Sequence, residues 1–320
     1  MKKLSVIIPA YQAELTISKC IESILRNTVE LEVLVVDDGS RDRTGDIISQ
    51  IAKNDIRVRT WTSANAGPGA AREFAMKHAR GEYVTFVDAD DYIETGFYDA
   101  IAEKLDGHLD ILEFGFVKET QEASLLSEHR MGVNACKGKA CGLYYAQQKN
   151  TTNFLWNKVF RKKMLQKVVF PHLFQSEDAA VLAQAFVFSK IYQSIDEIGY
   201  HYVMTRDSLC RKPFSIARLD SLKAYNFIDD FYSEYAPELC VYSRHKLCSL
   251  SVLLYCQCFN FANEYRTYCA GLLTVYRKNR LCFSLPQLLS MGSRSRRIML
   301  MLFEISPRLC ACVYSWRLTR

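Results

Sequence analysis

The chain has 320 residues, of which 49% are hydrophobic and 24% are charged, with 14 Gly and 7 Pro. These fractions exclude a disordered, collagen-like or low-complexity chain, and the length predicts one large domain or two smaller ones. The formal net charge of +6 is too small to indicate a nucleic-acid partner, and we expect none. From residue 277 onward, nine Lys or Arg accompany one acid, Glu304, so the basic excess belongs to the last part of the chain.

Targeting and redox features of the sequence point to a reducing compartment. Residues 1–9 lack the long apolar region and the cleavage site of a secretory signal. The longest uncharged run, residues 247–263, includes Gln257 and Asn260, so we expect a buried helix there rather than a membrane span. The 12 cysteines include no C-x-x-C pair, which favours reduced thiols over a disulfide framework. We therefore expect a cytoplasmic protein.

The first 115 residues alternate between short β-branched runs and amphipathic helical patterns. This alternation is typical of βαβ units and predicts an α/β fold with a mainly parallel sheet flanked by helices. The expected strands cover residues 4–8, 31–36, 58–62 and 83–87, and the expected helices cover 14–26, 44–53 and 70–79.

The later pattern is looser and becomes mostly helical. Strands are expected at residues 109–116 and 191–204, and helices at 143–145, 156–165 and 178–189. Helical periodicity then extends over 214–280, and Pro307 divides residues 294–320 into two short helices. We therefore expect two domains: an α/β domain over residues 1–212 and a helical extension over 213–320.

Acidic residues follow two of the expected strands, at 37–38 and 88–91. Ligands of an open parallel sheet bind at the carboxyl ends of its strands, so these acids mark a candidate site. Two explanations fit acids at such a place: a divalent cation bridges them to a diphosphate, or they accept hydrogen bonds from a base and a ribose. The sequence has neither a P-loop nor a G-x-G-x-x-G turn after its first strand, which argues against a kinase or an NAD enzyme.

An ordered set of short motifs carries a resemblance to a known family. The motifs are SVIIPAY at 5–11, VVDDGS at 35–40, NAGPGAAR at 65–72, FVDADD at 86–91, WNK at 156–158 and ED at 177–178. In this order, they resemble the family 2 glycosyltransferases with the GT-A fold, of the bacterial capsule, O-antigen or exopolysaccharide type. The likeness is strong over residues 1–115 and fair over 150–210. It implies a Rossmann-like GT-A domain and inverting, metal-dependent transfer from a UDP-sugar, with a hexose or an N-acetylhexosamine as the sugar.

The resemblance also implies roles for residues that bind the donor nucleotide. Asp38 is similar to the acid that accepts from the uracil N3–H. Pro9 and Tyr11 are similar to residues of the uracil and ribose pocket, where the tyrosine ring offers a stacking face. Glu14 is expected to line the same pocket. Arg72 resembles the arginine that reaches the nucleotide or its diphosphate.

Three carboxylates carry the implied chemistry. Asp88 and Asp90 resemble the D-x-D pair that binds Mn²⁺ or Mg²⁺, and oxygen ligands suit such hard cations. The metal would stabilise the charge on the UDP leaving group. Asp178 resembles the catalytic base that removes the proton of the acceptor hydroxyl. Glu177 precedes it on the acceptor side, and Ser176 is expected to cap the helix that begins there.

The acceptor side of the cleft is expected to include the motif Trp156, Asn157 and Lys158. His201 and Arg206 follow the late strand, where related chains place basic residues near the diphosphate. The implied acceptor is a glycan linked to a polyprenyl diphosphate.

The basic tail is expected to anchor the protein peripherally at the cytoplasmic face of the inner membrane. Arginines would meet the anionic headgroups while apolar residues enter the boundary; a plain solvated helical face is the alternative. The arginines are 294, 296, 297 and 308, and the apolar set comprises Ile298, Leu300, Leu302, Phe303, Leu309, Val313 and Trp316.

Structural alternatives exist for each motif taken alone. Residues 37–40 fit a turn, residues 88–91 fit a solvated helix start, and residues 177–178 fit a capped helix. The alternative functions are a nucleotidyltransferase, which would show a Gly-rich basic loop after the first strand, a sugar-nucleotide-binding protein without catalysis, and a glycerol-phosphate polymerase. Residues 9–12 are not such a loop, the intact Asp88, Asp90 and Asp178 argue against a protein without catalysis, and a polymerase would need a second phosphotransferase site that the sequence does not show.

Overall fold

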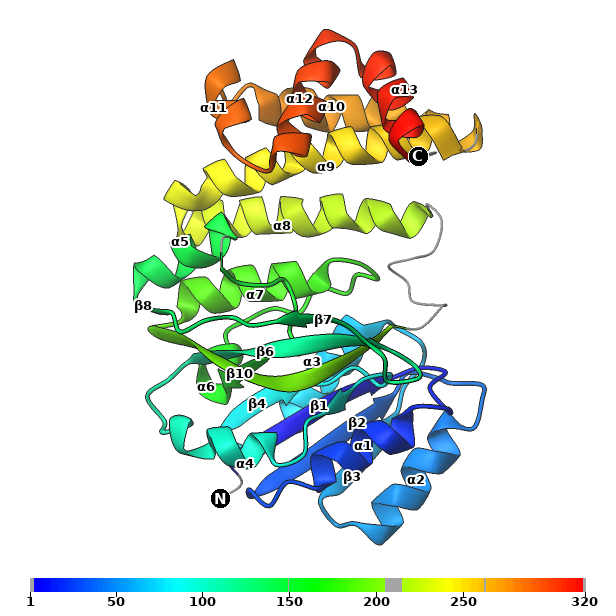
Figure 1. Cartoon of the computed structure of the whole chain (residues 1–320), viewed down its shortest axis with the longest axis vertical. Helices are drawn as coiled ribbons and strands as arrows, with labels where there is room; N and C mark the ends of the chain where they lie inside the picture. Colours follow the sequence, from blue (N-terminus) through cyan, green and yellow to red (C-terminus); the bar gives the residue numbers. More distant parts are fainter. Residues whose placement is uncertain (1–2, 149, 205–214, 262, 319–320) are drawn as a thin grey trace. The chain divides into compact units, whose positions relative to one another are not determined.

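The computed structural model describes residues 3–148, 150–204, 215–261 and 263–318. The chain divides into two compact units, residues 1–211 and 212–320 (Figure 1). The first unit begins with β1 (Leu4–Ala10), α1 (Ile17–Leu25), β2 (Leu31–Asp37), α2 (Thr44–Asn54), β3 (Val58–Thr62), α3 (Pro68–His78) and β4 (Tyr83–Phe86). It continues with β5 (Tyr92–Ile93), α4 (Phe97–Ile101), the 3₁₀ turn η1 (Ala102–Lys104), β6 (Ile111–Thr120), β7 (Leu125–His129), β8 (Ala135–Lys137), α5 (Lys139–Gln147), β9 (Lys158–Arg161), α6 (Lys162–Leu165), α7 (Glu177–Phe188) and β10 (Ile191–Met204).

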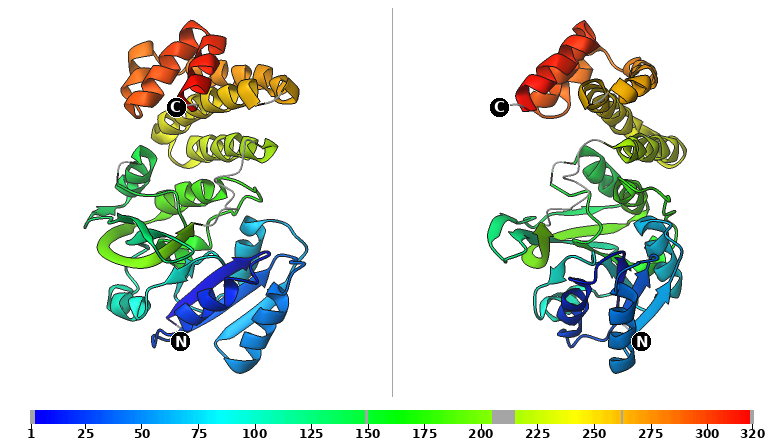
Figure 2. Two further views of the ribbon diagram at one scale, coloured as in Figure 1. Left: turned by 45° about the vertical axis from the view of Figure 1, so that its right-hand side comes forward. Right: turned by 90° about the vertical axis from the view of Figure 1, so that its right-hand side faces the viewer.

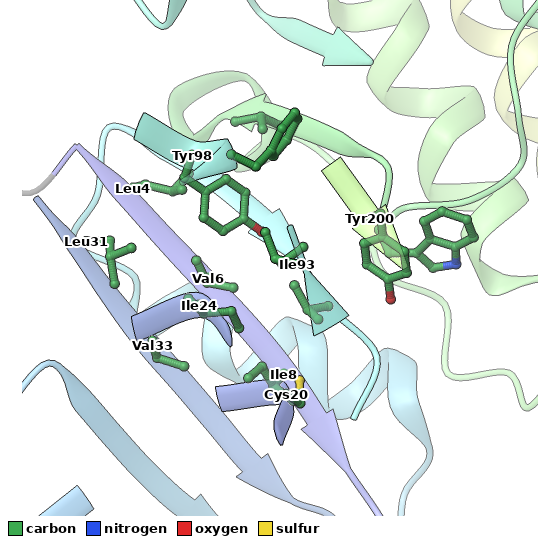
Figure 3. Packing of buried hydrophobic residues seen from close by; sticks show 14 of the residues in the cluster. Leu4, Val6, Ile8, Cys20, Ile24, Leu31, Val33, Ile93, Tyr98 and Tyr200 are labelled. Carbon is green, nitrogen blue, oxygen red and sulfur yellow. The ribbon is translucent and has the colours of Figure 1, made fainter. Parts of the chain in front are cut away.

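The core of this unit follows from the two-residue period of its strands. Val6 and Ile8 of β1 pack on one face of the sheet with Val33 of β2 (Figure 3). The apolar stripe of α1, which includes Cys20 and Ile24, completes this cluster. Both β1 and β2 are buried over almost their whole length, as expected for strands in a covered parallel sheet.

The strands form one mixed sheet in the order β3-β2-β1-β4-β9-β6-β10-β5, with β7 beside β6 and β8 beside β10. The predicted parallel arrangement is confirmed for β3, β2, β1 and β4. Strand β9 then runs antiparallel to both β4 and β6, while β6 and β10 are parallel to each other. The sheet is therefore a parallel half joined to a mixed half.

Two local predictions are wrong. The helix expected over residues 156–165 is strand β9 followed by the short helix α6, because β9 fills the position between β4 and β6. Ser176 does precede α7, but its backbone has a φ of 63° and its side chain makes no capping hydrogen bond.

The second unit is helical, as predicted. Its long helix α9 packs against α8, α10, α12 and α13 (Figure 2, yellow to red). The helices are α8 (Asp220–Tyr235), α9 (Cys240–Phe261), α10 (Cys269–Arg280), α11 (Leu285–Ser290), α12 (Arg294–Ile305) and α13 (Pro307–Leu318), with 3₁₀ turns η3 (Ile216–Leu219), η4 (Pro237–Leu239) and η5 (Asn263–Tyr268).

Two of the apolar residues that were expected to enter the membrane boundary are buried in this unit. Pro307 does separate two short helices, α12 and α13. However, Leu300 and Phe303 are buried, and the Phe303 ring packs edge-on against Tyr255 and Tyr276. These two side chains therefore belong to the interior of the helical unit and cannot enter a lipid boundary. The Trp316 side chain lies outside the described residues. Within the described ranges, no helix combines the length and apolarity needed to cross a membrane.

Candidate active site

The candidate site begins where the parallel strands end. Pro9 pairs with Val36 across β1 and β2, and the Asp38 N–H donates to the Ala10 carbonyl over 2.8 Å. On the other side of β1, Phe86 of β4 pairs with Ile7, so the acids that follow β4 share this edge with Asp38. The register therefore brings together two of the acidic motifs that the sequence indicated.

Asp38 fixes the loop that leads into α3. Its carboxylate is buried; Oδ1 accepts from the Ser63 hydroxyl at 2.9 Å and the Ala66 N–H at 3.0 Å. Oδ2 accepts from the N–H of Gly67 at 2.8 Å. Gly67 has a φ of 92°, a conformation that favours glycine. Because Oδ2 carries one of the three bonds, it keeps the greater capacity to accept from a ligand.

The loop after β1 exposes the Tyr11 ring, whose exposed fraction is 46%. This loop is tied to the chain that follows β2: the Gln12 N–H donates to the Ser40 hydroxyl at 2.9 Å. The Glu14 carboxylate accepts from the Arg43 N–H at 3.0 Å, at the start of α2. Tyr11 is thus placed to stack on a ligand, whereas Glu14 holds the loop.

Asp88, Asp90 and Asp91 follow β4 and differ in their surroundings. Asp91 is buried and accepts from the Tyr200 hydroxyl at 2.6 Å and the Val203 N–H at 2.8 Å, so it supports the fold. Asp88 and Asp90 stay partly exposed. Burial and the nearby Asp88 charge raise the pKa of Asp90 to about 6.

The donor set of Asp88 and Asp90 fits a hard divalent cation. Both residues offer only carboxylate oxygens, the ligand type that Mg²⁺ and Mn²⁺ prefer. A cation would also offset the repulsion that raises the Asp90 pKa. Among the residues that the structure describes, no group of three or more His, Cys, Asp or Glu could hold a metal. The remaining ligands would therefore come from a substrate or from water.

Arg72 connects the D-x-D motif to the third acidic motif. Its buried guanidinium lies 2.8 Å from Asp88 Oδ1, 2.7 Å from Glu177 Oε1 and 3.3 Å from Asp178 Oδ1. The arginine predicted to reach the nucleotide is thus surrounded by carboxylates in this structure. Glu177 and Asp178 are more than 100 positions away in sequence, so no local pattern could have indicated this cluster.

Asp178 lies in the first turn of α7, where the candidate base was predicted. Burial raises its pKa to about 7, against the lowering effect of Arg72 and with the help of Glu177 and Asp88. Its Oδ2 accepts from the Leu155 N–H at 3.2 Å, and a fifth of its side chain is exposed. A carboxylate with a pKa near 7 and some access to solvent is suited to general base catalysis.

Asn157 and Lys158 do not face an acceptor, which corrects the prediction made from the WNK motif. Both side chains are fully buried. Lys158 Nζ lies 3.0 Å from Glu113 Oε1 and donates to the carbonyls of Thr152 and Phe154 at 3.0 and 2.9 Å. Through these contacts, Lys158 and Glu113 support the loop that precedes β9 from the interior of the protein. Glu113 escaped the sequence analysis because an acid within an apolar strand carries no motif.

Trp156 is also a core residue rather than an exposed acceptor platform. Its ring is buried and stacks between Phe154 and Tyr200, with centroid distances of 4.5 and 4.2 Å. The Tyr200 hydroxyl in turn accepts from the Asp88 N–H at 3.1 Å. The tryptophan therefore supports the D-x-D loop through Tyr200, a residue that no sequence motif singled out.

His201 lies between two carboxylates. Its Nε2 is 2.9 Å from Glu94 Oε2, its Nδ1 is 3.2 Å from Glu119 Oε2, and its ring stacks on Tyr92 at 4.3 Å. These partners occupy both ring nitrogens. Arg206, the other basic residue predicted after the late strand, lies outside the described residues.

Comparison with known proteins identifies the family. The model of "Glycosyl transferase family 2" matches residues 5–180, which is more than half of the chain. The chain belongs to glycosyl transferase family 2. The match spans every motif from the first strand to Asp178, so the family membership expected from the sequence is confirmed.

Two relatives and one solved structure place this family 2 member more closely. It is 30% identical over 260 residues to the uncharacterized glycosyltransferase EpsJ of Bacillus subtilis strain 168, covering 76% of each chain. It is 29% identical over 247 residues to a poly(ribitol-phosphate) beta-glucosyltransferase of Bacillus spizizenii, covering 72% of this chain and 36% of that protein. The crystal structure of Staphylococcus aureus TarS 1–349 in complex with UDP-GlcNAc superposes with a TM-score of 0.75 at 20% identity, over 99% of this chain and 92% of that one. The predicted GT-A fold with a helical C-terminal extension is confirmed.

Proposed function

We propose that this protein is an inverting, metal-dependent glycosyltransferase that moves a hexose or an N-acetylhexosamine from UDP to an acceptor hydroxyl. One observation carries the proposal: Arg72 holds Asp88, an acid of the D-x-D motif, and Asp178, the candidate base, in one ion cluster. The family membership and the UDP-GlcNAc complex of the similarly folded TarS support it.

The chain's own residues account for the chemical step. Asp178 accepts the proton of the acceptor hydroxyl while that oxygen bonds to the anomeric carbon and the bond from that carbon to the UDP oxygen breaks. Attack from the face opposite UDP inverts the anomeric centre. Asp88 and Asp90 would hold Mn²⁺ or Mg²⁺, which as a Lewis acid offsets the negative charge on the departing diphosphate. Arg72 keeps Asp178 in place and favours its charged form.

The nucleotide would bind at the ends of β1 and β2. The exposed Tyr11 ring offers a face on which uracil stacks, next to Pro9. Asp38 Oδ2 accepts from the uracil N3–H, a donor that cytosine lacks. Glu14 contributes by holding the loop that presents Tyr11.

For the acceptor, we propose a glycan linked to a polyprenyl diphosphate and presented at the inner membrane face. The basic excess from residue 277 onward supports an anionic partner. Arg294 and Arg296 are exposed at the start of α12 and are available for it. Leu300 and Phe303 are buried and take no part in such contact, whereas Leu309 is exposed.

The decisive experiment is a panel of UDP-, GDP-, CMP- and dTDP-sugars, scored by thermal shift and by donor hydrolysis, each with and without Mn²⁺. Metal-dependent stabilisation by a UDP-sugar, and hydrolysis lost in Asp178→Asn, is the expected result. Stabilisation by a CMP-sugar, whose cytosine lacks the N3–H donor, would contradict the Asp38 assignment. Equal responses with Mn²⁺ and with a chelator would contradict the metal.

A further inference from the structure

A cavity of about 280 Å³ lies within the helical unit, between α9, α12 and α13. This volume is close to the lower limit of about 300 Å³ for small-molecule pockets. Its wall is mainly apolar, with two basic side chains and two serines. The lining residues are Lys246, Ser249, Leu250, Val252, Leu253, Ser295, Arg296, Met299, Leu300 and Tyr314.

The two cations of the cavity, Lys246 and Arg296, have no acid beside them. None of the lining residues is acidic, and no ion pair found among the described residues includes either cation. Two acids of this unit form ion pairs elsewhere, Asp229 with Arg244 and Glu304 with Arg280. Burial and the neighbouring Arg296 charge lower the pKa of Lys246 to about 8. Arg296 is exposed and Lys246 is partly buried, so an anion between them would offset the repulsion that Lys246 experiences.

The start of α12 adds to this positive potential. Three arginines, Arg294, Arg296 and Arg297, occupy its first turn, with no acid there and no capping hydrogen bond from the Ser293 side chain. Cations at a helix N-terminus oppose the helix dipole, whereas an anion at that end is stabilised. In the wall of the cavity, the Ser249 hydroxyl is buried and has no hydrogen-bond partner in the described structure.

We propose that this cavity binds an amphiphile that carries a phosphate, with its apolar chain along Leu250 and Leu253 and its phosphate between Lys246 and Arg296. The apolar wall suits the alkyl chain of such a ligand, and the two cations without an acidic partner suit its phosphate. Every residue that lines the cavity belongs to the helical unit, whereas Asp88, Asp90 and Asp178 belong to the first unit.

The test is isothermal titration calorimetry of the full chain with dodecyl phosphate below its micelle concentration. Inorganic phosphate and the neutral dodecyl maltoside are the comparison ligands. Arg296→Gln should weaken dodecyl phosphate binding by about tenfold, the usual effect of losing one charge-assisted hydrogen bond. Arg294→Gln, in the same helical turn but outside the cavity wall, should weaken binding far less, because it changes only the longer-range potential. Equal losses in the two variants would overturn the proposal.

A second pair of variants tests the cavity itself. Met299→Trp should fill it and abolish binding, whereas Met301→Trp, on the same helix but outside the wall, should not. Dodecyl phosphate binding that survives in Met299→Trp would contradict the proposal. Inorganic phosphate that binds as tightly as dodecyl phosphate would show that the cavity does not bind the alkyl chain. Farnesyl phosphate and vesicles containing phosphatidylglycerol then distinguish the two kinds of amphiphile. Tighter binding of farnesyl phosphate identifies a single-chain carrier, and tighter binding of the vesicles identifies a bilayer lipid.

Discussion

Arg72 and Asp178 form a 3.3 Å ion pair, and the guanidinium that makes it also holds Asp88 at 2.8 Å. The two acids come from different parts of the chain, one after β4 and one at the start of α7. A single buried side chain therefore sets the placement of both the candidate metal ligand and the candidate base.

Arg72→Lys should test this arrangement, because a lysine keeps the charge but loses the planar fork that spans several carboxylates. We expect kcat/KM to fall about 100-fold, the scale of losing one preorganised electrostatic contact. The matched control is Arg59→Lys, which alters an ion pair to the buried Glu32. Steady-state kinetics decides; equal activity in the two variants would show that the Arg72 fork is dispensable.

The pH dependence of transfer should follow Asp178. Because burial raises the pKa of Asp178 to about 7, the base is protonated and inactive at lower pH. We expect kcat/KM to rise with pH through about 7 and to level off above it. A pH–rate profile of the wild type measures this rise. A profile that is flat between pH 6 and 8 would require another base.

Asp178→Asn should be inactive in transfer and yet more stable than the wild type at pH 8. The pKa of Asp178 is about 7 in the folded state and 3.8 as the ordinary value. At a pH between these two values, Asp178 is therefore protonated in the folded state and ionised in the unfolded state. The associated stability is present at low pH and is lost as pH rises through about 7. Asparagine stays neutral and avoids this loss. Urea unfolding at pH 5 and pH 8 measures the change, and a variant that is less stable than the wild type at pH 8 would contradict it.

Asp90→Asn should remove metal-dependent activity without unfolding the protein, because the side chain is partly exposed. Activity is measured during Mn²⁺ titration after chelation. Asp46→Asn, an exposed acid in the first turn of α2, serves as the control for a change of charge. Full activity of Asp90→Asn would remove this residue from the metal site.

Lys158→Met should destabilise the protein by about 3–5 kcal/mol, because it leaves Glu113 as a buried carboxylate without its cation. Adding Glu113→Gln should recover part of the loss. The exposed Lys163→Met is the control. Urea unfolding gives the free energies, and an additive double variant would show that the pair does not interact.

The parallel half of the sheet could be predicted because short, consecutive stretches of sequence indicate its strands. Strands β1, β2 and β4 are short, mainly apolar runs, acids follow β2 and β4, and topology alone places the carboxyl ends of these strands at one edge. This reasoning located Asp38, Asp88 and Asp90. Asp178 was located by the order of the motifs.

The burial of Lys158 could not be predicted in the same way. A lysine in WNK suggests an exposed charge, and only the tertiary partner Glu113 makes its complete burial tolerable.

The secondary structure of residues 156–165 was ambiguous from the sequence. The apolar residues at 156, 159, 160, 164 and 165 suit a helix as well as a strand, so the hydrophobic periodicity could not exclude either. Likewise, the amphipathic pattern of α12 does not tell whether lipid or protein covers Phe303.

The stack of Trp156 on Tyr200 has a spectroscopic consequence. The Asp88 N–H donates to the Tyr200 hydroxyl, and the Trp156 indole stacks on the Tyr200 ring. Tyr200 therefore links the indole to the D-x-D loop. The protein has three tryptophans, and Trp61 packs elsewhere, against Phe74 and His78. A form in which Trp61 and Trp316 are replaced by phenylalanine would retain a single emitting tryptophan near the proposed donor site. Its fluorescence would report occupancy of that site without a labelled substrate.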